Sequence, residues 1–188
     1  MPITEIDPIA ALVIIDLQKG IVAMAAAQGA TNVVHHAANL ARAFRKRGLP
    51  VVLVNVDKPA PGRTDAPRRS LDGLPPDWTE IAHELEPHAT DHRITKHAPG
   101  AFFGTDLDAY LRQRNATQIV LAGISTTTGV ESTARSAFDL GFNVVFASDA
   151  MTDMSAENHA HAHGGLRMQA KQDRQDRGSS SHRAFHPF

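Results

Sequence analysis

Cysteine is absent from all 188 residues of the chain. Without a thiol the chain forms no disulfide, offers no thiolate to a metal and carries no thiolate nucleophile. Catalysis through a covalent bond to cysteine is therefore excluded. Any chemistry that this chain performs has to rely on carboxylates, amines, hydroxyls, imidazoles or the backbone.

An excess of charge of one sign is also lacking. The chain has 19 basic and 20 acidic residues, which are interspersed and give a formal net charge of −1. Such a balance creates no broad field that would attract nucleic acid or an anionic membrane. No apolar run approaches the roughly 20 residues that span a bilayer, and the N-terminus lacks the pattern of a signal peptide. We expect a cytoplasmic protein whose partner is a small-molecule substrate, with no nucleic acid and no membrane.

Apolar strands and amphipathic helices alternate along most of the chain, whose hydrophobic content of 42% suits one sizeable core. β-Branched apolar runs predict strands at residues 11–16, 51–56, 94–96, 118–124 and 143–149. Spacings of three and four predict helices at residues 31–47, from Thr105 onward and at residues 129–140. This order predicts an α/β fold of three layers, a Rossmann-like and mostly parallel sheet with helices on both faces.

Two stretches show neither the apolar runs of a strand nor the three-to-four spacing of a helix. Residues 57–76 are rich in Pro, Gly and Arg, and a loop of that length in a compact domain is usually functional or mobile. Residues 166–188 are almost all polar and cannot bury enough apolar surface to offset the entropy of ordering. We therefore expect one domain over residues 1–165, followed by a poorly ordered polar tail at 166–188.

Polar residues gather where the predicted strands end. Because the carboxyl ends of parallel strands meet at one edge of a sheet, ligands of such folds bind there. The residues at or just beyond these ends are Asp16, Asp57, Lys96, the segment 125–129 and Asp149. This edge is the predicted place of a functional site.

Three ordered motifs carry a resemblance to a known family. They are VIIDLQKG from Val13, ITKHAPGAFFGTDLDAYL from Ile94, and LAGISTTTGVESTARSAFDLGFNVVFASDAMTD from Leu121. In this order and spacing the chain closely resembles the isochorismatase-like hydrolases, a superfamily that also holds nicotinamidases and N-carbamoylsarcosine amidases. The resemblance runs from about Ala11 to His163.

Most members of that family bring an Asp, a Lys and a Cys together at the strand ends. By motif, the Asp is Asp16 and the Lys is Lys96, while the position of the cysteine is Gly129. No acyl-enzyme or thioester can form there. The resemblance places this chain in the subgroup with Gly in place of the nucleophile, as in the isochorismatases proper. Their hydrolysis of a vinyl ether needs no enzyme nucleophile, because the Asp protonates the enolpyruvyl carbon and water adds to the resulting cation.

The leading hypothesis is therefore an isochorismatase-like hydrolase that uses Asp16 as acid or base and Lys96 as its electrostatic partner. General acid catalysis requires burial to raise the pKa of Asp16 against the lowering effect of Lys96. One alternative is a catalytically silent member that binds a small molecule or acts as a subunit. Another is an amidase in which Asp16 activates water. A structural aspartate or a solvated lysine would be the simpler interpretation without the three motifs.

The hydroxyls before Gly129 are ambiguous. Ser125 and Thr126 either contact substrate or cap the helix that follows, and the two roles are equally plausible. The resemblance also implies a cis peptide bond between Ile124 and Ser125, which would direct backbone amides near Gly129 toward developing negative charge, as in an oxyanion hole.

Further substrate-binding candidates are Gln18, Phe103 and Arg63. Gln18 follows the aspartate as in isochorismatases, although a structural hydrogen bond is as plausible. Phe103 could wall an apolar pocket, whereas Trp78, on a predicted helix with Ile81 and Leu85, is better explained by packing. Arg63, with Arg68 and Arg69, could bind a carboxylate, but a solvated basic loop is slightly favoured.

A metal centre is not expected. Nicotinamidases of the family carry an Asp and two His in the loop after the second strand, where this chain has Asp57, Lys58 and Pro59. The other histidines, His159, His161 and His163, lack a matching ligand motif, which favours solvated side chains. We expect no metal and no cofactor. The resemblance implies a homodimer or homotetramer, because family members commonly form such assemblies.

Overall fold

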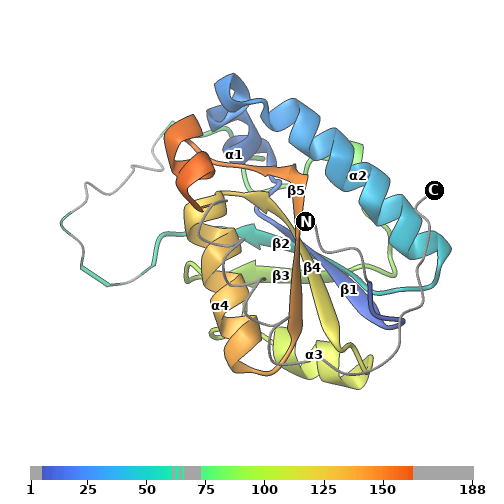
Figure 1. The fold of residues 1–188 in the computed structure, drawn as a ribbon. Coiled ribbons are helices and arrows are strands. Elements are labelled where there is room, and N and C mark those ends of the chain that lie inside the picture. Colours follow the sequence, from blue (N-terminus) through green and yellow to red (C-terminus); the bar gives the residue numbers. More distant parts are fainter. Residues whose placement is uncertain (1–5, 61, 64, 66–72, 163–188) are drawn as a thin grey trace.

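The computed structural model of the protein describes residues 6–60, 62–63, 65 and 73–162 (Figure 1). Its strands form one sheet in the order β3-β2-β1-β4-β5, and each neighbouring pair is parallel. The strands are β1 (Ala10–Ile15), β2 (Val51–Val56), β3 (His92–Lys96), β4 (Gln118–Ile124) and β5 (Asn143–Thr152). The predicted α/β fold with a parallel sheet is confirmed. The polar tail at 166–188 lies outside the described residues.

Helices cover both faces of the sheet (Figure 1). The helices α1 (Lys19–Met24) and α2 (Ala30–Lys46) lie on one face, and α3 (Leu107–Gln113) and α4 (Glu131–Asp139) on the other. Because strand side chains alternate between faces, Leu12 and Ile14 pack beneath α2 while Val13 and Ile15 pack toward α3 and α4. The whole of β1 is therefore buried. In the described part of the chain, no helix is both long and apolar enough to cross a membrane.

Several boundaries differ from those predicted. β1 ends at Ile15, one residue before Asp16, and β3 begins earlier than predicted, at His92. The predicted helix at 129–140 is a π-helical turn, η3 (Thr126–Val130), followed by α4. The carbonyl of Ser125 accepts hydrogen bonds from the N–H groups of both Thr128 and Val130, which widens this turn. Two 3₁₀ turns, η1 (Ala26–Gln28) and η2 (His83–Leu85), had no signal in the apolar periodicity.

A glycine brings the two central strands together next to the strand ends. Gly123 in β4 has a φ of +124°, and a Cβ built on it would lie 2.0 Å from the carbonyl oxygen of Ile15. Only glycine fits so close an approach of two backbones. The end of β4 is thereby held against the end of β1, immediately before Asp16.

Candidate active site

Asp16 is the first residue beyond β1, and its backbone leaves the extended conformation with a φ of 52°. Among residues with a Cβ, Asp is one of those that tolerate this left-handed region best. Its N–H still donates to the carbonyl of Val54, at 2.9 Å, so the residue remains tied to β2. The turn therefore begins at the carboxyl edge of the sheet with the carboxylate held in a defined place.

Lys96 ends β3 and forms an ion pair with this carboxylate. Its Nζ lies 2.8 Å from Oδ2 of Asp16, and the side chains are 4% and 8% exposed, respectively. Because β2 lies between β1 and β3, the lysine stem reaches across the end of the intervening strand. Nζ also donates to the carbonyl of Ala98, at 3.3 Å. An ammonium has three N–H donors, so one remains for a ligand.

Burial dominates the electrostatics of Asp16. It raises the pKa of this carboxyl to about 6, although the charge of Lys96 and its hydrogen bond act in the opposite direction. The second oxygen, Oδ1, is buried and has no hydrogen-bond partner among the described residues. A buried acceptor without a partner is energetically unfavourable and is expected at a site that a ligand completes. A carboxyl with a pKa near 6 can give or take a proton close to neutral pH.

Gly129 lies beside the same carboxylate. A Cβ built on Gly129 would be 3.4 Å from Oδ2 of Asp16 and only 2.7 Å from Cγ2 of Ile15. The Ile124–Ser125 peptide bond at the start of this turn is cis. Within the turn, the N–H groups of Thr127, Thr128 and Val130 are bonded to Asp153 or to Ser125. The structure thus brings Asp16, Lys96 and Gly129 together, with Oδ1 of Asp16 and one N–H of Lys96 left for a ligand.

The packing at Gly129 also predicts the effect of restoring a side chain. Gly129→Cys would force its Cβ against the β-branched side chain of Ile15, and such overpacking costs about 1–3 kcal/mol of stability. In an Ile15→Ala background the same substitution should cost less, because the obstructing methyl is gone. Urea denaturation of the four proteins of this cycle measures the difference. An equal cost in both backgrounds would contradict the predicted clash.

Gln18 makes structural hydrogen bonds, which is the alternative that the sequence left open for it. It is fully buried, and its Nε2 donates to the carbonyls of Val56 and Trp78 at 2.9 and 3.2 Å. Its Oε1 accepts the N–H of Val56, at 2.8 Å. All its hydrogen-bonding groups therefore connect the ends of β1 and β2 to the segment around Trp78. The structural alternative holds for this residue.

The hydroxyls of the turn also differ from one another. Thr126 is fully buried, and its Oγ1 lies 3.0 Å from the carbonyl of Thr152 and 2.8 Å from Nδ1 of His159. These contacts join the turn to the end of β5, which favours a structural role for Thr126 over substrate contact. Ser125 is half-buried at the start of the turn, and its hydroxyl has no partner among the described residues. Substrate contact by Ser125 stays a prediction.

Phe103 and Arg63 are not part of this cluster in the structure. Phe103 is 81% exposed, and substrate contact by this residue stays a prediction. It belongs to the loop that follows Lys96, where the neighbouring Phe102 instead stacks on Phe142. Arg63 is an exposed loop residue, while Arg68 and Arg69 lie outside the described residues. The predicted homo-oligomer stays a prediction.

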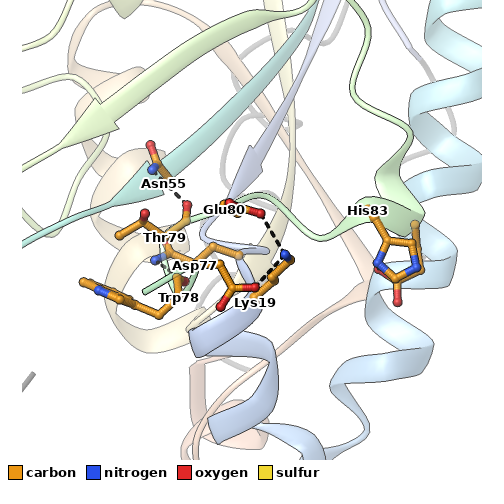
Figure 2. A network of polar contacts seen from close by, with 9 residues as sticks. Lys19, Asn55, Asp77, Trp78, Thr79, Glu80 and His83 are labelled. Carbon is orange, nitrogen blue, oxygen red and sulfur yellow. Dashed lines mark hydrogen bonds and ion pairs between the residues drawn. The ribbon is translucent and has the colours of Figure 1, made fainter. Parts of the chain in front are cut away.

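The spacing of apolar residues also did not predict the segment that is hydrogen-bonded to residues 17–20, just after Asp16. Residues 77–80 form a turn and a bend rather than the predicted helix, Ile81 forms an antiparallel bridge with Gln18, and the segment lies along residues 17–20. Lys19 donates to Asp77 and Glu80, each at 2.7 Å, while Asn55 holds the carbonyl of Thr79 (Figure 2). The long loop after β2 is therefore attached close to the site.

Two histidines near the strand ends contact other side chains of the protein. His97 pairs with Asp57 at 3.0 Å, and His159 contacts Thr126. His161 is exposed and His163 lies outside the described residues. In the described ranges, no group of three or more His, Asp or Glu side chains is arranged to hold a metal ion.

Comparisons with known proteins agree with this geometry. The isochorismatase domain matches residues 10–173. The isochorismatase family protein YwoC of Bacillus subtilis is 46% identical over 156 residues, which cover 79% of this chain and 80% of YwoC. An isochorismatase family protein from Burkholderia thailandensis has a similar structure, with a TM-score of 0.77, 41% identity, and coverage of 85% of this chain and 87% of that one. N-carbamoylsarcosine amidase from Thermoplasma acidophilum has a TM-score of 0.68 and 28% identity over 84% of this chain and 92% of its own.

The parallel sheet with helices on both faces, and the buried carboxylate–lysine pair at its carboxyl edge, are those of an α/β protein with an isochorismatase-like fold. The chain belongs to the isochorismatase family, whose members are hydrolases.

Proposed function

We propose that the chain hydrolyses a small vinyl ether of the isochorismate type by proton transfer from Asp16, without a covalent intermediate. One observation carries this proposal. The Asp16 carboxyl is buried, has a pKa of about 6, and faces a glycine where a nucleophile would otherwise stand. A general acid of this pKa is useful near neutral pH.

The reaction balances with the groups at hand. Asp16 gives its proton to the terminal CH₂ carbon of the enolpyruvyl ether, which leaves an oxocarbenium ion. Water adds to that cation and its proton returns to the Asp16 carboxylate. The hemiketal then collapses: its hydroxyl loses its proton as the C=O bond forms, the bond to the ether oxygen breaks, and this oxygen takes up a proton and leaves as an alcohol, so that a keto acid remains. No bond to the protein forms, so the absence of a side chain at Gly129 is no obstacle.

Two donors suit an anionic substrate. Lys96 is bonded to Oδ2 of Asp16 and keeps a third N–H, and the backbone of Gly129 lies beside the same oxygen, since a Cβ built there would be 3.4 Å away. They would bind a substrate carboxylate or the oxygen that gains negative charge. Ser125, with its hydroxyl unengaged, is a further candidate donor.

A second candidate is an amidase in which Asp16 takes a proton from water, and the similarity to N-carbamoylsarcosine amidase favours it. With a pKa of about 6, Asp16 is mostly ionised at neutral pH, as a general base must be. A catalytically silent, ligand-binding role is the third possibility, since the site lacks any nucleophile of the cysteine type.

The dependence of kcat/KM on pH separates these functions. If Asp16 is the acid, its protonated form is active, so kcat/KM should be constant below about pH 6 and fall about tenfold per pH unit above it. If Asp16 is the base, the profile is reversed, with a rise toward pH 6 and a plateau above. Turnover of enolpyruvyl ethers and of small amides and ureas should be followed from pH 4.5 to 8.5. A rising limb on every active substrate would refute the acid mechanism, and no turnover on any class would favour the silent binder.

A further inference from the structure

A second buried carboxylate lies at the same edge of the sheet, and the site described so far makes no use of it. Asp153 directly follows β5 and is 2% exposed. Its Oδ2 accepts hydrogen bonds from the N–H and the hydroxyl of Thr127, at 2.8 and 2.7 Å. Its Oδ1 accepts the N–H of Met154, at 2.8 Å. Two of these three bonds hold the turn that contains Gly129.

A carboxylate with this little exposure is tolerated only when hydrogen bonds replace its lost water. No Lys, Arg or His of the described residues forms an ion pair with Asp153, so these three donors provide the compensation. Hydrogen bonds to a charged acceptor are roughly twice as strong as neutral ones. The contact between Asp153 and Thr127 is therefore a strong and specific constraint on the turn.

The constraint acts two residues away from Gly129. Asp153 engages the N–H of Thr127, and the carbonyl of Ser125 engages those of Thr128 and Val130. Thr126 adds a contact to the carbonyl of Thr152, so that two successive threonines face the end of β5. The N–H groups on both sides of Gly129, those of Thr127, Thr128 and Val130, are thus bonded to Asp153 or to Ser125.

We infer that Asp153 is a positioning residue, which fixes the turn so that the Gly129 amide stays beside the Asp16 carboxylate. This role rests on the proposed function, because it assigns the Gly129 amide to a substrate oxygen. Asp153 itself contacts neither Asp16 nor the reacting atoms. Displacing a catalytic donor by about 1 Å is sufficient to lower a rate by about 100-fold.

The experiment compares Asp153→Ala with Asp91→Ala. Asp91 is a matched control, because it is also buried and accepts hydrogen bonds from Arg45 and the N–H of His88, but it precedes β3 at the opposite edge of the sheet. Both variants should lose thermal stability. Only Asp153→Ala should lower kcat, by about 100-fold with little change in KM, when both are assayed well below their melting temperatures.

Conservative variants keep the test decisive if Asp153→Ala folds poorly. Asp153→Asn retains one oxygen for Thr127 but turns an amide donor toward the N–H of Met154, so its kcat should lie between those of wild type and Asp153→Ala. Thr127→Val removes the hydroxyl and keeps the backbone bond, and should also be intermediate. Equal losses of kcat in the Asp153 and Asp91 variants would overturn the positioning role.

Two readouts separate this inference from the proposed function. Hydrogen exchange at the amides of residues 127–130 should accelerate in Asp153→Ala and not in Asp91→Ala. The titration of Asp16, followed by NMR, should shift in Asp153→Ala as well, since Gly129 lies against its carboxylate. If wild type turns over no substrate, the proposed function fails, while these two measurements still decide the inference. Unchanged exchange together with an unchanged titration would refute it.

Discussion

Asp16→Asn is expected to lower kcat/KM by about 1000-fold, within the range attributed to a general acid or base. The asparagine side chain has nearly the same shape, so Ile15 and Gly129 keep their packing. It has no proton of suitable acidity to give and no basic oxygen to receive one. Steady-state turnover of the enolpyruvyl ether, measured below pH 6 where wild type is fastest, quantifies the loss.

Asp57→Asn is a suitable control for this experiment. Asp57 also follows a strand end, that of β2, but it is about half-exposed and pairs with His97 rather than with Lys96. Its substitution should leave turnover close to that of wild type. Activity of Asp16→Asn within tenfold of wild type would show that the proton comes from another group.

Lys96→Met is expected to destabilise the fold by about 3–5 kcal/mol near pH 8, because it leaves the buried Asp16 carboxylate without its cation. The loss should be smaller near pH 5. Lys96 lowers the pKa of Asp16, so its removal raises that pKa further above 6 and lets the carboxyl accept a proton at low pH. Urea denaturation at the two pH values measures both effects.

The sign of this pH dependence follows from linkage. The pKa of Asp16 is raised on folding, from 3.8 to about 6, so its protonated form stabilises the folded state below about pH 4. That contribution is lost as the pH rises through about 6 in wild type, and at higher pH in Lys96→Met. The double variant Asp16→Asn/Lys96→Met removes both charges and should recover much of the stability at pH 8. A double variant no more stable than Lys96→Met would contradict this account.

Sequence reasoning was most successful for the buried strands. The run at 51–56 forms β2 with the predicted bounds, and the run at 118–124 forms β4. Their continuous β-branched side chains leave no plausible alternative to strands covered on both faces. The turn at 126–130 was less accessible to such reasoning, because its hydrogen bonds depend on Ser125, Thr152 and Asp153, which come from different parts of the chain.

The side chains of the site also divide into those that the sequence predicted and those whose contacts only the structure showed. Motif spacing pointed to Asp16 and Lys96, and the structure places them 2.8 Å apart. Motif spacing did not reveal that the side chain of Gln18 is hydrogen-bonded to Val56 and Trp78, or that Phe103 is exposed. A motif identifies a residue type at a position, whereas its availability to a substrate depends on neighbours that are remote in sequence.

The sequence by itself determined that this protein has no thiol, that its strands and helices alternate, and that its candidate acid follows the first strand. These properties are local, since they depend on composition and on the spacing of apolar residues along the chain. Only the tertiary structure decided the state of that acid. Burial raises its pKa to about 6 against the opposing effect of the Lys96 ion pair from β3, and its second oxygen is left without a partner among the described residues. Such properties arise from long-range packing, because strands far apart in sequence meet at one edge of the sheet.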